Sequence, residues 1–289
     1  MQSHQESMEN DTKKFIIAIF AVGIFIGSII GGVYVYSGVS PPFTVINSGS
    51  MQHSDESSIG TIDTGDMVIV KNPDYQEITT YVEGSKTDYS KFGEYGDVII
   101  YRSGDRNIIH RAMLHMTLYE TGTVTQKWYI PELKDYDNWD IKSILGSVKS
   151  LYWDNENCIL TVDISSTFYL TDVGYGDGEP SVNIFKLGIG KDVGYSGYLT
   201  KGDNAETNKT FDQNSSIHPE LVTEEDIKSI AAVEIPWLGC IKLWVNDKNT
   251  DLIPENSITS LIIVFVVLIS IIIALFAVSW YLDKKDERK

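Results

Sequence analysis

The chain has 289 residues, of which 43% are hydrophobic and 22% are charged, and its formal net charge is −17 at pH 7. This length accommodates one sizeable soluble domain together with membrane segments, and it argues against a many-domain protein. The acidic balance disfavours nucleic acid or anionic lipid as a main binding partner.

A first apolar segment covers residues 15–37, which contain no charged side chain. A helix needs roughly 20 residues to cross the hydrocarbon core of a bilayer, so this segment is long enough to span a membrane. A cleaved secretory signal peptide is the alternative reading, but its apolar core usually covers only roughly 7–15 residues. We therefore expect a transmembrane anchor at 15–37.

A second uncharged segment covers residues 258–282 and predicts a second transmembrane helix. Lys13 and Lys14 immediately precede the first span, and four basic residues follow the second. Basic residues close to a span tend to remain on the cytoplasmic side. We therefore expect a two-span protein of the cell membrane, with cytoplasmic tails at 1–14 and 283–289.

The region between the spans, residues 38–256, is then external and carries the whole net charge. Short runs rich in Val, Ile, Tyr and Thr alternate there with Gly-Asp turn signals, a pattern typical of β-strands. The clearest runs are MVIV (67–70), VIIYR (98–102), WYI (128–130) and CILTVDI (158–164). The sequence therefore predicts a mainly β external domain flanked by two transmembrane helices.

Other parts of the external region are less regular. Residues 112–195 are rich in Tyr, Asp and Gly and predict an insertion or subdomain. A Thr-x-x-Asp start predicts a short helix over Thr223–Ile230. Cys158 and Cys240 both lie where a disulfide is permitted, and two unpaired small apolar residues are the alternative.

The first candidate for chemistry is Ser50, in the segment Asn47-Ser48-Gly49-Ser50-Met51. Gly49 permits a tight turn that would present Ser50 at the end of a short β-prone run. An ordinary Ser/Gly turn is the competing interpretation. Ser50 follows the first span by 13 residues, so at most about 44 Å of extended chain separates it from the bilayer.

Two further segments contain residues that a serine nucleophile would need, namely a base and an acid that orients it. His110 continues an apolar run and is either a hydrogen-bonded strand residue or a catalytic base. Asp203 lies in a Gly-Asp-Asn turn and is either a turn former or the acidic partner of a histidine. Neither segment alone decides between these alternatives.

Taken in order, these segments resemble the type I signal peptidases of the archaeal and endoplasmic-reticulum branch. That branch uses Ser and His where the bacterial branch uses Ser and Lys. The segments that carry the resemblance, beside the first span, are SGSM (48–51), GDMVIV (65–70), GDVIIY (96–101), IHR (109–111) and TKGDN (200–204), with a weaker one at IPWLG (235–239).

Carried over residue by residue, the resemblance makes Ser50 the nucleophile and His110 the general base. Ser48 occupies the position of a hydroxyl that helps the oxyanion hole, where the backbone N–H of Ser50 would be the other donor. Asp203 occupies the position of one essential acid and is expected to orient His110.

The chain departs from the family pattern at two places. The family has a proline shortly after Ser-x-Ser-Met, where this chain has Gln52-His53-Ser54-Asp55, and we expect His53 to be a solvated loop residue. A second acid usually follows Gly-Asp-Asn by several residues. Here the sixth residue after Asp203 is Lys209, and a short insertion would bring Asp212 to that position as the second or alternative acid.

The resemblance implies a signal-peptidase-like β fold and removal of signal peptides from exported preproteins at the outer face of the membrane. Its expected partners are these signal peptides and membrane lipid, with the protein-export channel as a further candidate and no nucleic acid. The chemistry requires no metal and no cofactor. The competing hypothesis is a non-catalytic membrane-tethered β-domain, either a binding or surface protein or an inactive peptidase homologue.

Overall fold

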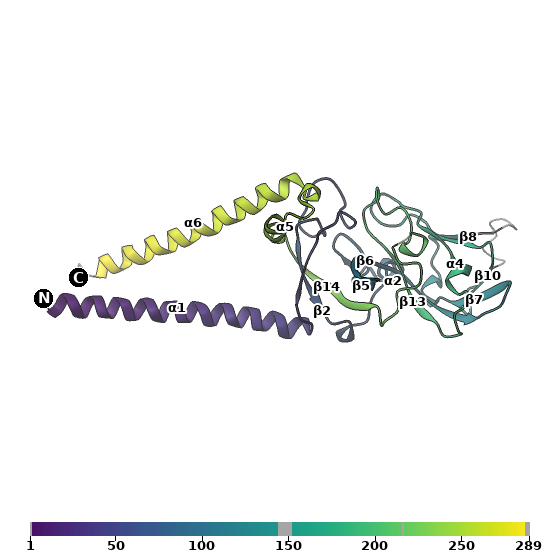
Figure 1. Ribbon diagram of the computed structural model, residues 1–289, viewed down its shortest axis with the longest axis horizontal. Helices are drawn as coiled ribbons and strands as arrows, with labels where there is room; N and C mark the ends of the chain where they lie inside the picture. The colour runs from purple at the N-terminus through teal and green to yellow at the C-terminus, as the bar shows by residue number, and fades with distance from the viewer. Residues whose placement is uncertain (1, 144–151, 216, 287–289) are drawn as a thin grey trace.

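The computed structural model describes residues 2–143, 152–215 and 217–286 of the chain. Two long helices lie at one end of an elongated molecule, and a body made mainly of β-strands lies at the other end (Figure 1). The two chain termini lie at the outer ends of these helices, on the same side of the body (Figure 1). The predicted β-rich domain between two terminal helices is thus confirmed.

The long helices are α1 (Gln2–Ser37) and α6 (Glu255–Asp286). Within them, Ile16–Ser37 and Glu255–Tyr281 are long and apolar enough to cross a membrane. Almost none of either segment is buried against the body, so their apolar side chains face outward over most of the length. Continuous exposed apolar surface of this extent matches a hydrocarbon environment better than water.

The central element of the body is an antiparallel sheet in the order β1-β2-β14-β5-β6-β7-β10-β9, with β13 also paired to β6. Buried and half-exposed positions alternate along strands such as β2, as expected where a sheet buries one face. The strands are β1 (Phe43–Val45), β2 (Met67–Lys71), β5 (Val98–Ser103), β6 (Arg106–Glu120), β7 (Thr125–Tyr129), β9 (Trp153–Asp154), β10 (Ile159–Asp163), β13 (Ser196–Lys201) and β14 (Ile227–Ile235).

Smaller elements surround this sheet. A three-stranded sheet has the order β12-β11-β8, and β3 pairs with β4 in a short hairpin. Their bounds are β3 (Ser90–Lys91), β4 (Glu94–Tyr95), β8 (Trp139–Lys142), β11 (Thr167–Leu170) and β12 (Ser181–Asn183). The short helices are α2 (Tyr81–Thr87), α4 (Ile184–Leu187) and α5 (Cys240–Asn246), with 3-10 turns η1 (Pro73–Tyr75), η2 (Pro131–Leu133), η3 (Asp212–Asn214) and η4 (Thr250–Leu252).

The segment 112–195 is continuous with the rest of the body. β6 runs through its boundary at residue 112, pairing with β5 at its start, β13 along its middle and β7 at its end. The largest core cluster joins side chains of this segment to Val82, Phe211 and Leu221 from outside it. The segment therefore extends the same sheet and core away from the long helices, while its residues 144–151 lie outside the described residues.

One sequence-based expectation differs from the structure, and the structure decides between two alternatives that the sequence leaves open. The prediction of a helix over Thr223–Ile230 is wrong. Asp226 instead accepts hydrogen bonds from Thr223 N and Oγ1, which close a single turn. The chain then enters β14 at Ile227, where pairing with β2 and β5 outweighs the local helical signal. Cys158 and Cys240 are both buried free thiols, so the disulfide alternative is not realised.

Candidate active site

Ser50 lies in a turn that follows β1 and is fixed by the residues on either side. Ile46 N donates to Asp66 O at 3.0 Å, and Gly65 N donates to Ile46 O at the same distance. Met51, directly after Ser50, is only 1% exposed and packs in a core cluster with Ile46. A buried anchor on each side therefore holds the turn and leaves Ser50 at its surface.

The hydroxyl groups of Ser48 and Ser50 are neighbours, with their Oγ atoms 3.3 Å apart. Ser50 N donates to no protein acceptor within the parts of the chain that the structure describes. A hydroxyl and a free backbone N–H beside one serine are the kind of donors that stabilise a developing oxyanion. The hydroxyl groups of Ser48 and Ser50 thus lie within hydrogen-bonding distance of each other.

The Gly-Asp-Asn turn at 202–204 packs directly against the Ser50 turn. Asn204 N donates to Ser50 O at 3.0 Å, and Asn204 Nδ2 donates to Gly49 O at 2.8 Å. A Cβ atom on Gly202 would lie 2.4 Å from Ser50 O, which is closer than real contacts allow. Gly202 is therefore required for this close approach. Asn204 holds the backbone at Gly49 and Ser50 through two hydrogen bonds.

His110 lies on β6, is 2% exposed, and contacts Asp212 through Nδ1, 2.7 Å from the Oδ2 atom. Asp212 begins η3 and is itself buried. Because an ionised carboxylate only accepts hydrogen bonds, the proton of a neutral His110 belongs on Nδ1. The Nε2 atom then carries the lone pair that a general base needs.

Two hydroxyl groups support the Asp212 carboxylate. Tyr101 OH and Thr200 Oγ1 each donate to Asp212 Oδ2 at 2.7 Å. Burial and the adjacent Asp212 raise the pKa of Tyr101 well above its usual range, so its phenol keeps the proton that it donates. The other oxygen, Asp212 Oδ1, has no hydrogen-bond partner among the described residues.

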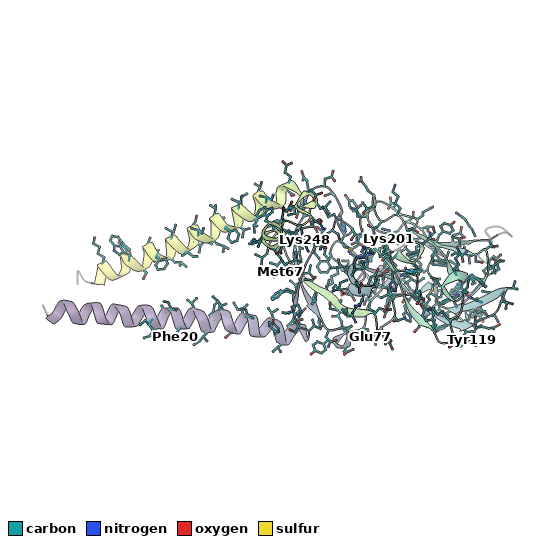
Figure 2. All side chains as sticks on the ribbon, in the orientation of Figure 1. Phe20, Met67, Glu77, Tyr119, Lys201 and Lys248 are labelled. Atoms are coloured by element: carbon teal, nitrogen blue, oxygen red, sulfur yellow. The ribbon has the colours of Figure 1, made fainter. Side chains whose placement is uncertain are left out.

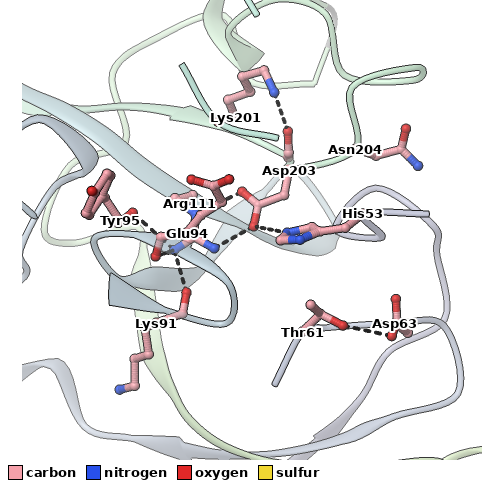
Figure 3. Close-up of polar contacts among 12 residues, drawn as sticks. His53, Thr61, Asp63, Lys91, Glu94, Tyr95, Arg111, Lys201, Asp203 and Asn204 are labelled. Atoms are coloured by element: carbon pink, nitrogen blue, oxygen red, sulfur yellow. Dashed lines mark hydrogen bonds and ion pairs between the residues drawn. The ribbon is translucent and has the colours of Figure 1, made fainter. Parts of the chain in front are cut away.

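The sequence predicts that Asp203 orients His110. In the structure, Asp203 pairs with the buried Arg111 instead (Figure 3). Arg111 Nε donates to Asp203 Oδ1 at 2.9 Å, and the guanidinium also donates to Asp203 Oδ2. Burial alone would raise the pKa of Asp203, but Arg111 and His53 hold it well below its usual range. The aspartate that contacts His110 is Asp212.

His53 is not the solvated loop residue that the sequence predicts. Its side chain is 11% exposed, and its Nε2 atom lies 3.3 Å from Asp203 Oδ2 (Figure 3). Its ring also stacks on Tyr175, with ring centroids 5.1 Å apart and 16° between the planes. The loop after Ser50 is therefore ordered by an acid that lies far from it in the sequence, which local sequence signals do not reveal.

Lys201 is a further charged residue at the site and is 5% exposed. Its Nζ atom donates to Gly202 O at 2.8 Å (Figure 3). Burial lowers the pKa of Lys201, and the nearby Asp203 and Asp212 oppose this effect. Tyr101, Thr200 and Lys201 all lie in the segments of the family resemblance, but the sequence gives no sign of which side chains they contact.

Ser48, Ser50 and His110 line one open cleft of about 1090 Å³. Residues Asp251–Glu255, which lead into α6, line the same cleft. Ser48, Ser50 and the imidazole of His110 therefore border one space large enough for an extended peptide, although no hydrogen bond joins Ser50 to His110 among the described residues. No group of three or more His, Cys, Asp or Glu side chains within the described ranges is arranged to hold a metal ion.

Comparison of the chain with protein-family models, curated proteins and solved structures finds no match. A functional assignment therefore rests on the residues of this site and on their geometry.

Proposed function

We propose that this chain is a membrane-bound serine endopeptidase that removes signal peptides from exported preproteins, with Ser50 as nucleophile and His110 as general base. The observation that carries the proposal is the buried His110–Asp212 pair, which faces the same cleft as the Ser48–Ser50 turn. An acid held by two hydroxyl donors behind a histidine is the arrangement that orients a general base.

The chemistry follows from these roles. Neutral His110 takes the hydroxyl proton of Ser50 as Oγ attacks the scissile carbonyl carbon. The Ser48 hydroxyl and the Ser50 N–H donate to the oxyanion, and Asp212 stabilises the imidazolium that forms. His110 then gives the proton to the leaving amine, leaving an acyl group on Ser50. Attack by water on this ester releases the new carboxyl end and restores the serine.

The position of the cleft supports a substrate that is itself at the membrane. Residues that line the cleft run directly into α6, whose candidate span begins at Glu255. The basic residues outside both spans favour cytoplasmic termini and an external body, as in the sequence-based topology. A signal peptide still embedded in the bilayer would then bring its cleavage site to the mouth of the cleft.

The substrate preference follows from the family resemblance rather than from the cleft. Type I signal peptidases select small residues one and three positions before the cut, and we extend that preference to this chain. The protein-export channel is the partner that would deliver such substrates to the external face.

The test is cleavage of a purified preprotein by the detergent-solubilised full chain, comparing the parent with Ser50→Ala. We expect a single cut after the signal peptide with the parent, and loss of at least about a thousandfold in rate with Ser50→Ala. Ser58→Ala is the matched control, because Ser58 is an exposed serine outside the cleft, and it should cleave like the parent. Equal rates for the parent and Ser50→Ala would refute the proposal and favour a non-catalytic tethered domain.

A further inference from the structure

A tight hairpin at Val173–Gly178 lies in the segment whose role the sequence leaves open. Val173 N donates to Gly178 O at 3.1 Å, and Gly178 N donates to Val173 O at 3.0 Å. Gly174 and Gly176 have φ values of +70° and +90°, which glycine adopts without strain. The four residues between the paired positions therefore form a closed tip of defined shape.

The base of this hairpin is anchored in the body. Val173 is 1% exposed and belongs to the largest core cluster. Gly174 N donates to the hydroxyl of Tyr81 at 3.0 Å, which ties the hairpin to α2. The tip is thus a fixed projection, supported by the core rather than by contacts within a long loop.

The tip contacts both segments that hold Ser50. The ring of Tyr175 stacks on His53, which follows the nucleophile by three residues. A Cβ atom on Gly176 would lie 3.1 Å from the Cβ of Ala205, and Ala205 directly follows Asn204. Since Asn204 donates to Ser50 O, the hairpin bridges the two walls of the cleft next to the nucleophile.

His53 gives Tyr175 a rigid platform. Its Nε2 atom contacts Asp203, and a Cβ atom on Gly93 would lie 2.8 Å from its Cε1 atom, so the ring is held on a second side. Tyr175 itself is 49% exposed and lines the cleft. One face of the phenol ring is thus covered by His53, and the remaining surface is available to whatever occupies the cleft.

We propose that this hairpin tip is a specificity wall of the cleft, in which Tyr175 limits the size of the substrate side chain admitted beside Ser50. The inference rests on the proposed function, because it takes a peptide to be the occupant. A fixed aromatic ring excludes bulky side chains by steric overlap and contacts small ones, which is how pockets distinguish apolar residues of different size. The wall comes from the segment 112–195, which gives that segment a part in substrate selection.

The test measures peptide binding without turnover, in a Ser50→Ala background of the full chain in detergent. The probes are fluorescent peptides that span a signal-peptide cleavage site, with either Ala or Phe at the residue before the cut. We expect the Ser50→Ala chain to prefer the Ala peptide, and added Tyr175→Ala to reduce that preference by about tenfold or more. Tyr175→Phe, which keeps the ring, should preserve the preference.

Tyr119→Ala is the matched control, because Tyr119 is 58% exposed and lies at the end of the body away from the long helices (Figure 2). An unchanged preference in Tyr175→Ala, or the absence of binding of either peptide to every variant, overturns the inference. Failure of the proposed function is distinguished by the separate cleavage assay. In that case Ser50-dependent cleavage is absent, while the shift in binding preference still reports on Tyr175.

Discussion

At Asp212, one carboxylate oxygen accepts hydrogen bonds from His110, Tyr101 and Thr200, each at 2.7 Å. Such convergence fixes the direction of the imidazole and the position of its Nδ1 proton. Asp203, by contrast, compensates the charge of the buried Arg111 and fastens the loop at His53. Under the proposed function the two aspartates therefore have different tasks, one in proton transfer and one in maintaining the site.

These tasks predict that one amide substitution lowers kcat and that the other lowers the free energy of unfolding. Asp212→Asn removes the obligate acceptor, allows the wrong His110 tautomer, and should lower kcat for preprotein cleavage about 10³- to 10⁴-fold. Asp203→Asn leaves the Arg111 charge poorly compensated and should lower the free energy of unfolding by about 3 kcal/mol.

The measurements are kcat for preprotein cleavage and the denaturation midpoint of each variant. If Asp203→Asn removed activity with an unchanged midpoint while Asp212→Asn stayed active, the assignment of the two acids would be reversed.

The sequence predicts Ser48, Ser50 and His110 as candidates because each lies in a short segment whose local pattern carries the signal. It favours Asp203 over Asp212 as the partner of His110, which differs from the observed contact, because that contact depends on the path of the chain between β13 and η3. It does not predict the burial of His53, since the acid that holds His53 lies 150 residues away in the sequence.

At the scale of elements, β6 connects the site to the rest of the body. The strand carries His110 and Arg111 near its start, and its later residues pair with β13 and β7. Sequence patterns predict its apolar runs, but not that 15 residues form one strand. Continuity across residue 112 depends on pairing partners that arrive much later in the chain, so local propensity cannot establish it.

The turn η2 also contacts β6, through the half-buried side chain of Glu132. Glu132 accepts a hydrogen bond from Thr80 Oγ1, and its carboxylate lies 3.3 Å from His115 N on β6. Burial raises the pKa of Glu132 to about 7, from an ordinary value of 4.5. The folded chain therefore holds the proton to higher pH than the unfolded chain does.

The sign of the pH effect follows from this difference. The contribution of Glu132 to stability is complete below pH 4.5 and is lost as the pH rises through 7. Glu132→Gln cannot ionise, so relative to the parent it should gain about 1–3 kcal/mol of unfolding free energy between pH 5 and pH 8.5. Denaturant unfolding at the two pH values measures this gain.

Glu225→Gln is the control for that comparison, because Glu225 is exposed and should give the same difference from the parent at both pH values. A Glu132→Gln variant whose stability relative to the parent is the same at pH 5 and pH 8.5 would contradict the raised pKa of Glu132.

At the scale of the whole molecule, the two long helices leave the same side of the body (Figure 1). The residues that line the cleft extend to Glu255, the first residue of α6. The sequence predicts both helices well, because a helix satisfies all the backbone hydrogen bonds of an uncharged apolar segment of this length without help from water. It does not predict the hairpin tip at the cleft, because Tyr175 and His53 meet only through the packing of the β body.

The central claim, that Ser50 acts with His110, is tested most directly by kcat/KM of His110→Ala for preprotein cleavage at neutral pH, measured with the full chain in detergent. Lys201 is another basic side chain at the site, but its Nζ atom is buried and donates to Gly202 O. We predict that kcat/KM falls by at least about a thousandfold relative to the parent. Retention of kcat/KM within about tenfold of the parent would contradict the claim, since such a loss is too small for removal of the general base.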